Sequence, residues 1–270
     1  MPRTISEKRV AFRDMHRQGC FILPNAWDAG SARLFERVGF SAIASTSSGL
    51  AWTMGRGDYG LELDDVLPHL ATLAAATDLP VNADFEAGFA PDPEGVATNV
   101  GRAISIGVAG LSIEDRDLSG DGLHELPVAL ERLRAARTAI AASGEDVLLV
   151  ARTEGLLLDR SAIHPAIDRL VAFAQAGADC LYAPGVMDRA AIADMVRAVA
   201  PLPVNVLALD PTMTLSELAD LGVRRVSVGG SLAAVGWAAV IAAAKSIRAG
   251  DFSPLASRAQ GLDSLFSPPG

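Results

Sequence analysis

The chain has few cysteines, a deficit of positive charge and no histidine cluster, and each shortage argues against a class of protein. Its two cysteines, Cys20 and Cys180, each lie in an apolar run, so we expect reduced, buried thiols and no disulfide framework. Lysine and arginine total 23 against 32 acidic residues, and the net charge of -9 argues against nucleic acid or an anionic membrane as a partner. The four histidines lack the spacing of zinc ligands, and no glycine-rich phosphate loop follows the first apolar segment.

Long hydrophobic runs are also missing, although 50% of the residues are hydrophobic. Residues 1–19 are charged and amphipathic, without the apolar centre of a signal peptide. We find no run of the ~20 apolar residues that a membrane span requires. The sequence therefore predicts a cytoplasmic protein with ample material for a large core, either one α/β barrel or two ordinary domains.

Short apolar segments typical of strands alternate with helical patterns along the whole chain. We expect strands at residues 21–27, 42–48, 80–86, 110–115, 148–154, 179–184, 203–209 and 225–229. We expect helices at residues 6–17, 31–38, 64–77, 93–106, 127–142, 162–176, 189–199, 215–221 and 237–249. Eight strand–helix units after an extra N-terminal helix predict a (β/α)₈ barrel, with a doubly wound open sheet as the alternative. This single domain would fill residues 1–270, with the N-terminal helix in 1–20, the barrel in 21–250 and a C-terminal arm in 251–270.

Asp84 and Glu86 are the most informative residues of the chain. They lie two positions apart at the end of the predicted strand 80–86, so we expect both carboxylates on one face. Two like charges beside an apolar interior are costly unless a cation neutralises them, and oxygen ligands suit Mg²⁺. The alternative is that Asp84 caps the next helix and Glu86 is solvated.

Other polar residues fall at the same end of the predicted barrel, where active sites form. These residues are Ser45, Thr46, Ser47 and Ser48 at the end of the second predicted strand, Glu114 and Asp115 at the end of the fourth, Arg152 and Glu154 at the end of the fifth, and Asn205 in the seventh. Arg152 follows a buried run, so its planar guanidinium either binds a carboxylate or phosphate or pairs with Glu114 or Glu154. The long loop at residues 49–65 holds Asp58, which either reaches a metal from a mobile lid or lies in an exposed turn.

The ordered set of these motifs resembles the isocitrate lyase and phosphoenolpyruvate mutase superfamily, in particular its small bacterial branch. The motifs are Leu-Pro-Asn-Ala-Trp-Asp at 23–28, Ser-Thr-Ser-Ser-Gly at 45–49, Gly-Arg-Gly-Asp at 55–58, Ala-Asp-Phe-Glu-Ala-Gly-Phe at 83–89, Ile-Glu-Asp at 113–115, Ala-Arg-Thr-Glu at 151–154 and Val-Asn-Val at 204–206. Their order and spacing fit from about residue 20 to residue 245, nearly the whole chain.

The resemblance implies a (β/α)₈ barrel whose last helix is exchanged between subunits of a homodimer or homotetramer. It implies one Mg²⁺, replaceable by Mn²⁺, bound mainly through Asp84, with its water ligands held by Asp58, Glu86 and Glu114. A small carboxylate substrate would then be bound by Ser45, Thr46, Ser47, Arg152 and Asn205. Catalysis would fall to Asp58, Glu114 and Arg152.

Two departures from the superfamily pattern bear on the reaction. The usual Asp-x-Asp pair is replaced by Asp84 and Glu86, which keeps the charge and lengthens one arm. Lyases that cleave isocitrate or methylisocitrate carry a Lys-Lys/Arg-Cys-Gly-His loop after the fourth strand, whereas residues 116–124 contain no cysteine and no lysine. The same loop lacks the lysine and asparagine typical of the phosphonopyruvate-forming mutase.

We therefore expect a Mg²⁺-dependent lyase that cleaves a carbon–carbon bond of a small α-oxo or α-hydroxy acid through a pyruvate enolate. Decarboxylation needs no thiol acid, and a retro-aldol cleavage belongs to the same class. One alternative is phosphorus–carbon chemistry, by a mutase or hydrolase acting on phosphonopyruvate or phosphoenolpyruvate. Another is a catalytically silent homologue that binds an oxo acid.

Overall fold

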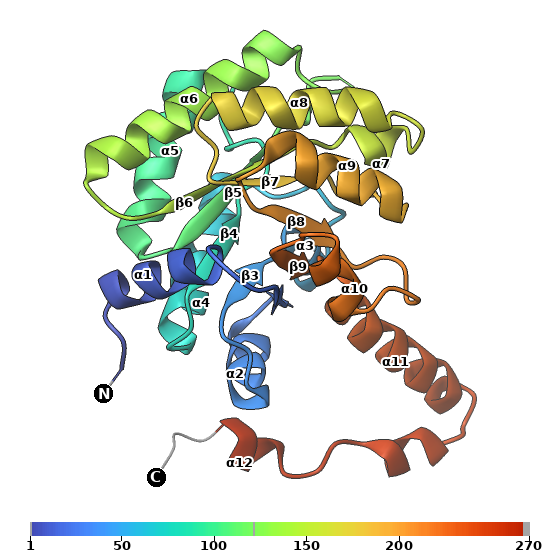
Figure 1. The fold of residues 1–270 in the computed structure, drawn as a ribbon. Coiled ribbons are helices and arrows are strands. Elements are labelled where there is room, and N and C mark those ends of the chain that lie inside the picture. The colour runs from blue at the N-terminus through green and yellow to red at the C-terminus, as the bar shows by residue number, and fades with distance from the viewer. Residues whose placement is uncertain (1, 121, 267–270) are drawn as a thin grey trace.

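The computed structural model describes residues 2–120 and 122–266, within which nine parallel strands form a nearly closed barrel (Figure 1). The strands are β1 (Phe21–Leu23), β2 (Asn25–Ala26), β3 (Ile43–Ser45), β4 (Val81–Asp84), β5 (Gly110–Glu114), β6 (Leu148–Arg152), β7 (Cys180–Tyr182), β8 (Val204–Leu207) and β9 (Arg225–Ser227). Their order around the sheet is β1-β9-β8-β7-β6-β5-β4-β3-β2. The predicted (β/α)₈ barrel is confirmed, and the ninth strand arises because the first predicted strand is divided in two.

The break between β1 and β2 lies at the seam where the barrel closes. Pro24 separates the two pieces, so that β1 pairs with β9 and β2 pairs with β3. The Asn25 side chain joins the two edges: its Oδ1 accepts hydrogen bonds from the N–H groups of Val228 (3.1 Å) and Gly229 (2.8 Å). Its Nδ2 donates to the carbonyl of Ser45 at 2.8 Å. The two halves of one interrupted strand thus form the two edges of the sheet, and the Asn25 side chain connects these edges.

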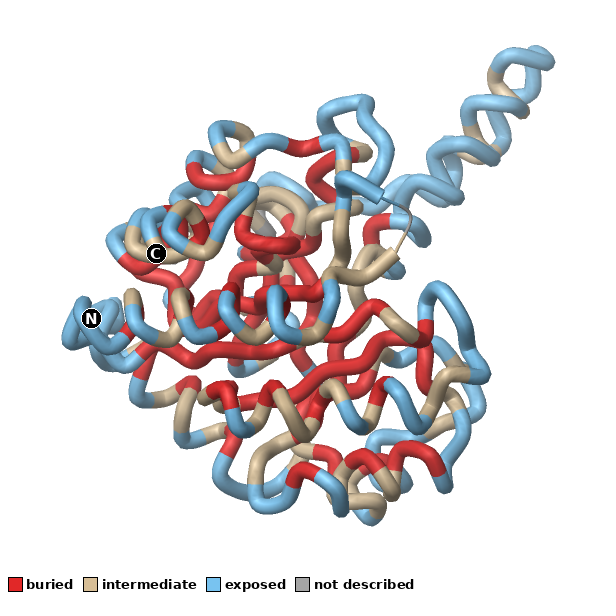
Figure 2. Tube along the Cα trace, turned by 90° about the horizontal axis from the view of Figure 1, so that it is seen from above, coloured by how far each residue is buried: buried red, intermediate tan, exposed pale blue. Residues whose placement is uncertain are grey.

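The helices before residue 230 surround the barrel and place their exposed faces outward, whereas the long helix that follows stands away from it (Figure 2). In chain order, the described helices are α1 (Ile5–Met15), α2 (Ala29–Val38), α3 (Ser47–Thr53), α4 (Leu63–Ala76), α5 (Pro93–Ile106), α6 (Leu126–Ser143), α7 (Gly155–Leu158), α8 (Ile163–Gln175), α9 (Arg189–Val199), α10 (Leu215–Asp220), α11 (Ser231–Arg248), the 3₁₀ helix η1 (Ser253–Ser257) and α12 (Leu262–Phe266). Local sequence sets their ends, as in α5: Asp92 caps the first turn by accepting from Gly95 N–H, and Gly107 ends the helix with a φ of 100°.

The short helix α3 was not expected from the sequence. It begins at Ser47, inside the predicted strand 42–48, because the Thr46 side chain accepts from the N–H of Gly49 and caps a helix there. The predicted long loop 49–65 is therefore shorter, running from the end of α3 to the start of α4.

Helix α1 closes the N-terminal end of the barrel. Phe12 is fully buried among apolar residues that include Leu23, Ala109 and Leu148. Gly110 makes room for it, because a Cβ on Gly110 would lie 2.8 Å from the Phe12 ring. This packing leaves the carboxyl ends of the strands as the open end of the barrel.

Helix α11 stands away from the barrel (Figures 1 and 2). Within it, Ala233 is the one buried residue, whereas Val235, Trp237, Val240 and Ile241 are exposed. Among the described helices, α11 alone is long enough and apolar enough to cross a membrane, judged by length and composition only. Its uninterrupted apolar run covers only residues 232–244, so the expectation that no apolar run reaches the ~20 residues of a membrane span is not contradicted.

Removing the Phe12 ring should destabilise the barrel strongly. We expect Phe12→Ala to lower the free energy of unfolding by about 3–5 kcal/mol, because it leaves a cavity under the strands. Val10→Ala on the same helix is the control, since Val10 is 50% exposed. Urea unfolding of both variants measures the effect, and equal losses for the two would contradict the role given to Phe12.

Candidate active site

The polar residues predicted to lie at one end of the barrel do meet there. Asp84, Glu114 and Arg152 are the last residues of β4, β5 and β6, which are neighbours in the sheet. Glu114 pairs directly with Arg152 in the β5–β6 register, and Asp84 pairs with Ser112 of β5. Because parallel strands end at the same edge, these three side chains emerge together at the open mouth.

Arg152 lies at the centre of this group. Its Nη1 is 3.4 Å from Asp84 Oδ1, and its Nε is 3.3 Å from Glu114 Oε2 and 2.5 Å from Glu154 Oε1. The guanidinium carbon also lies 5.4 Å from the ring centre of Tyr182. The sequence left two alternatives for Arg152, which were ion pairs with Glu114 or Glu154 and binding of a substrate anion. The ion pairs are present, and the position of Arg152 at the mouth is compatible with anion binding as well.

The loop after β3 orients Asp84 and Asp58. The N–H of Ser47 donates to Asp84 Oδ2 at 2.9 Å, and the N–H of Asp84 donates to Ser45 Oγ at 2.8 Å. The Ser47 hydroxyl donates to Asp58 Oδ1 at 3.3 Å, which brings Asp58 to the same mouth. Ser47 thus contacts both carboxylates, through its N–H and its hydroxyl, and the Ser45 hydroxyl fixes the backbone of Asp84.

Glu86 reaches the site by a different route from the one predicted. The prediction that Asp84 and Glu86 share one face of a strand is wrong: β4 ends at Asp84, and Glu86 has a left-handed backbone with a φ of 42°. A turn after β4 therefore carries its side chain back into the protein, where it is 2% exposed. Because no strand period applies after Asp84, alternation cannot place this residue.

Backbone strain is concentrated in the two loops beside Asp84. In the described part of the chain, the non-glycine residues with positive φ are Tyr59 (60°), Glu86 (42°) and Phe89 (53°). Asn99 holds the second loop by donating from Nδ2 to the carbonyls of Gly88 and Phe89, both at 3.0 Å. Strained backbone kept in place by such contacts is typical of functional sites.

The carboxyl groups of the site outnumber the cations that contact them. Burial, followed by the charges of Asp84 and Asp58, raises the pKa of Glu86 to about 8. Burial also raises the pKa of Glu114 well above its usual value, although Arg152 opposes the shift. The pKa of Asp58 is raised by burial and by Asp84. Each raised pKa means that the negatively charged form of the carboxyl group is not fully stabilised by nearby positive charge or hydrogen bonds.

Two oxygens of the site lack hydrogen-bond partners. Glu86 Oε1 and Glu114 Oε1 are both shielded from solvent and accept no hydrogen bond from any described residue. Carboxylate oxygens with spare lone pairs are the donor set that Mg²⁺ takes, directly or through water. The described residues contain no group of three acidic, histidine or cysteine side chains already arranged as a closed ligand set. A cation bound here would therefore have to take most of its ligands from water.

Two of the predicted substrate-binding residues are engaged elsewhere. Thr46 is 2% exposed, and its hydroxyl caps α3 and contacts the Ser48 hydroxyl at 3.1 Å. Asn205 is 1% exposed inside the barrel, where its Nδ2 donates to Ser227 Oγ and its Oδ1 accepts from Arg225 Nε, both at 2.9 Å. Neither side chain contacts the acidic group around Arg152.

Two contributors to the site were missed as site residues in the sequence. The Tyr59 hydroxyl donates to Glu154 Oε2 at 3.1 Å and so ties the α3–α4 loop to the chain just after β6. Asp115 is buried below it and accepts from Thr153 Oγ1 (2.8 Å), Glu154 N–H (2.9 Å) and Arg169 Nη1 (3.0 Å). Tyr59 follows Asp58 in the chain, and Asp115 follows Glu114. This adjacency to two predicted site residues was the signal by which the sequence could have indicated them.

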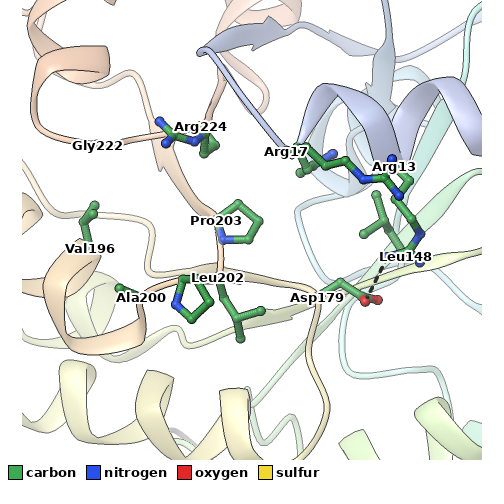
Figure 3. A pocket seen from close by; sticks show the side chains of 12 residues that line it. Arg13, Arg17, Leu148, Asp179, Val196, Ala200, Leu202, Pro203, Gly222 and Arg224 are labelled. Carbon is green, nitrogen blue, oxygen red and sulfur yellow. Dashed lines mark hydrogen bonds and ion pairs between the residues drawn. The ribbon is translucent and has the colours of Figure 1, made fainter.

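Two cavities lie at opposite ends of the molecule. One of about 510 Å³ adjoins the acidic group and is lined by Glu86, Arg116 and Arg132 among others. Another of about 630 Å³ lies beside α1 at the N-terminal end, with Arg13 and Arg17 on one side and Arg224 across from them (Figure 3). None of the carboxylates that contact Arg152 lines this second cavity. The chemistry is therefore expected at the first end.

Comparison with known proteins decides the family. The model for phosphoenolpyruvate phosphomutase matches residues 12–248, which is most of the chain. The chain belongs to the isocitrate lyase and phosphoenolpyruvate mutase superfamily. The resemblance inferred from the motifs is thus confirmed, and so is the prediction of an enzyme of lyase or mutase type.

Several members of the superfamily cover much of the chain. The 2-methylisocitrate lyase of Escherichia coli (strain K12) is 30% identical over 203 residues, which are 71% of this chain and 67% of the relative. Oxaloacetate decarboxylase 2 of Pseudomonas putida (strain W619) is 31% identical over 198 residues, 69% and 63% of the two chains. The chain is also similar to a crystal structure from Burkholderia cenocepacia J2315 that is named only by the general class lyase/mutase. The TM-score is 0.94 at 41% identity, and the match covers 98% of both chains.

The raised pKa of Glu86 predicts that stability without divalent cations falls as the pH rises. Between the ordinary value of 4.5 and the folded value of about 8, the folded chain keeps a proton that the unfolded chain has lost. The free energy of unfolding should therefore decline across this window, and Glu86→Gln should make the decline shallower. Glu114 contributes in the same direction.

Denaturant unfolding in EDTA from pH 5 to pH 8 measures this slope. Glu131→Gln is the matched control, because Glu131 is exposed on α6. If wild type and Glu86→Gln have equal slopes, the electrostatic description of Glu86 is wrong.

Proposed function

We propose that the protein is a Mg²⁺-dependent lyase that cleaves a carbon–carbon bond of a small α-oxo or α-hydroxy acid through a pyruvate enolate. The observation that carries this proposal is the surplus of carboxyl groups around Arg152, including the unpartnered oxygens of Glu86 and Glu114. A divalent cation, Mg²⁺ or Mn²⁺, would neutralise the surplus. It would also draw Asp84 and Glu114 away from Arg152, whose guanidinium would become available to substrate.

Asp84 is the proposed direct ligand, because Ser45 and Ser47 already fix its position at the mouth. Asp58, Glu86 and Glu114 would orient the water molecules around the cation. When bound, Mg²⁺ would polarise the oxo group of the substrate and stabilise the negative charge of the enolate.

The remaining roles follow from the geometry of the mouth. Arg152 would bind the substrate carboxylate through its planar fork. Ser47 would donate a hydrogen bond to that carboxylate, because it is only half-buried whereas Ser45 and Thr46 are buried. Its hydroxyl would exchange the 3.3 Å hydrogen bond to Asp58 for one to the substrate. Asp58 and Glu114 have raised pKa values and would exchange the proton that cleavage requires.

Decarboxylation is the form of cleavage that the loop after β5 favours. Residues 116–124 contain neither the cysteine nor the lysine of the isocitrate and methylisocitrate lyases, and release of CO₂ needs no such acid. The similarity to an oxaloacetate decarboxylase points the same way. The match to the phosphomutase model keeps phosphorus–carbon chemistry on phosphonopyruvate or phosphoenolpyruvate as the second candidate.

Substrate trials separate these reactions. With Mg²⁺ present, the protein is incubated with oxaloacetate, methylisocitrate, phosphoenolpyruvate or phosphonopyruvate, and pyruvate and phosphorus are followed by NMR. We expect pyruvate from a carbon substrate without any phosphorus change. Free phosphate or a new phosphonate signal would support the second candidate, and oxo-acid binding without turnover would support a silent binding protein.

Asp84→Asn tests the proposed ligand. Loss of the direct carboxylate should lower kcat/KM by roughly two to three orders of magnitude, because charge stabilisation by the cation is worth several kcal/mol. The control is Asp64→Asn on α4, whose side chain is 89% exposed. Undiminished Mg²⁺-dependent turnover by Asp84→Asn would overturn the assignment.

We also propose a homodimer or homotetramer in which α11 packs on another subunit. Where a closing helix would cover β9 and β1, α11 leaves the barrel, and an apolar cavity of about 160 Å³ remains beside β8 and β9. Its lining includes Ile22, Val206 and Val226. The α11 helix of a second copy would cover this surface, and its own apolar residues would be buried without a membrane, which fits a cytoplasmic protein.

Charge on α11 should disrupt this assembly. Val240→Arg is expected to lower the mass measured by light scattering toward that of the monomer, since Val240 is 58% exposed in the single chain. Val38→Arg on α2 is the matched control, because Val38 is 65% exposed and lies outside α11. A monomeric wild type, or an unchanged mass for Val240→Arg, would contradict the proposed contact.

A further inference from the structure

The cavity of about 630 Å³ at the closed end of the barrel gathers three arginines (Figure 3). Arg13 in α1 and Arg17 just after that helix lie on one side of it, and Arg224, which directly precedes β9, lies across from them. Its volume is within the range of small-molecule sites, which is about 300–1,000 Å³. In a chain with a net charge of -9, such a concentration of positive charge calls for a physical reason.

Two of these arginines are available to a ligand. Arg224 is half-buried, and no hydrogen bond or ion pair of its side chain is found among the described residues. Arg17 Nη1 contacts Asp14 Oδ1 at 2.6 Å, but both side chains are exposed at the end of α1. Exposed pairs of this kind contribute little stability, so a ligand can replace the aspartate at small cost.

The acids around the cavity are already paired with other arginines. Asp179 belongs to the lining, and it is held by Arg13 at 3.2 Å, by Arg137, and by the N–H of Leu149 at 2.8 Å. Arg13 also pairs with Asp146. Neither acid therefore neutralises the two available arginines.

A further positive charge lies behind the cavity. Arg225 is 2% exposed inside the barrel, where it donates to the side-chain oxygens of Asn205 (2.9 Å) and Asn82 (3.4 Å) and pairs with no acid among the described residues. Its charge lies close enough to His16, which lines the cavity, to lower the pKa of that residue. The cavity is therefore an electrostatically favourable place for an anion.

His16 adds a buried hydrogen-bond acceptor to the same cavity. Burial, followed by the charge of Arg225, lowers its pKa to about 3, so the ring is neutral at pH 7. Its Nδ1 lies 2.8 Å from the carbonyl oxygen of Phe12, and this hydrogen bond requires the proton of the ring to be on Nδ1. The Nε2 atom then has a lone pair, is shielded from solvent and bonds to no described residue.

A phosphate monoester matches this combination of groups better than a carboxylate does. At neutral pH it exists partly as a monoanion, whose oxygens accept from arginine while its O–H donates to a neutral histidine nitrogen. An ionised carboxylate only accepts hydrogen bonds. Much of the remaining lining is apolar, with Val196, Pro201 and Leu202 among it, which suits an organic group attached to the phosphate.

We propose that the cavity at the closed end of the barrel binds an organic phosphate monoester, with Arg17 and Arg224 as its cationic partners, His16 as a hydrogen-bond acceptor and the apolar wall against its organic group. This second site lies at the opposite end of the barrel from Arg152, so it does not depend on the proposed function. A bound phosphate would connect the end of α1 to the chain that enters β9.

Calorimetry in EDTA at constant ionic strength tests this site, because without a divalent cation the carboxyl groups at the mouth disfavour anions. The probes are phenyl phosphate, inorganic phosphate and benzoate. We expect phenyl phosphate to bind wild type more tightly than inorganic phosphate, and about tenfold more tightly than benzoate. Arg224→Met should raise its Kd about tenfold, because one charge-assisted hydrogen bond is lost. Arg17→Met, at a side chain that is 70% exposed, is a second variant that should fold normally and also weaken binding.

Arg134→Met is the matched control, because Arg134 is an exposed residue of α6 and its loss changes the net charge equally. Its Kd for phenyl phosphate should equal that of wild type. Absence of phenyl phosphate binding, equal binding of benzoate, or an unchanged Kd in Arg224→Met and Arg17→Met would overturn the inference. Inorganic phosphate that binds as tightly as phenyl phosphate would overturn the assignment of an organic group to the apolar wall.

Discussion

The structure depends on an imbalance of charge at the open end of its barrel. Arg152 contacts the carboxyl groups of Asp84, Glu114 and Glu154, while Asp58 and Glu86 lie close enough to add to the same negative field. One guanidinium cannot compensate so many buried acids. The parallel sheet keeps them together nonetheless, because its strands end at one edge and its core holds them there. A bound cation is the simplest complement to this arrangement.

The rest of the fold divides into a closed end and an adaptable end. Phe12 and the rest of α1 pack against the N-terminal ends of the strands, while the seam is joined through Asn25. At the other end the loops carry the strained backbone of Tyr59, Glu86 and Phe89. Hydrogen bonds from Asn99 and Arg132 hold the second of these loops, at residues 87–90. Rigid strands thus position the charges, and the loops shape the space in which a substrate would lie.

Much of this arrangement was predictable because strand ends converge by topology alone. The apolar runs placed Asp84, Glu114 and Arg152 at the ends of neighbouring strands, which the register of β5 and β6 bears out. Alternation failed for Glu86, because the left-handed turn after Asp84 depends on loop contacts far away in the chain. The strand pattern also gave no sign that Asn205 is bonded to Arg225, because that residue comes from another strand inside the barrel. Long-range side-chain pairing is the information that a strand pattern lacks.

Proton release on metal binding tests the central claim most directly. If Glu86, whose pKa is raised to about 8, holds its proton only because no cation compensates it, adding Mg²⁺ at pH 7 should displace protons as it binds. Calorimetric titration in two buffers of different ionisation enthalpy measures both the binding and the number of protons released. The account predicts one Mg²⁺ per chain with net proton release that becomes smaller in Glu86→Gln. Absence of Mg²⁺ binding, or binding without any proton release, would contradict it.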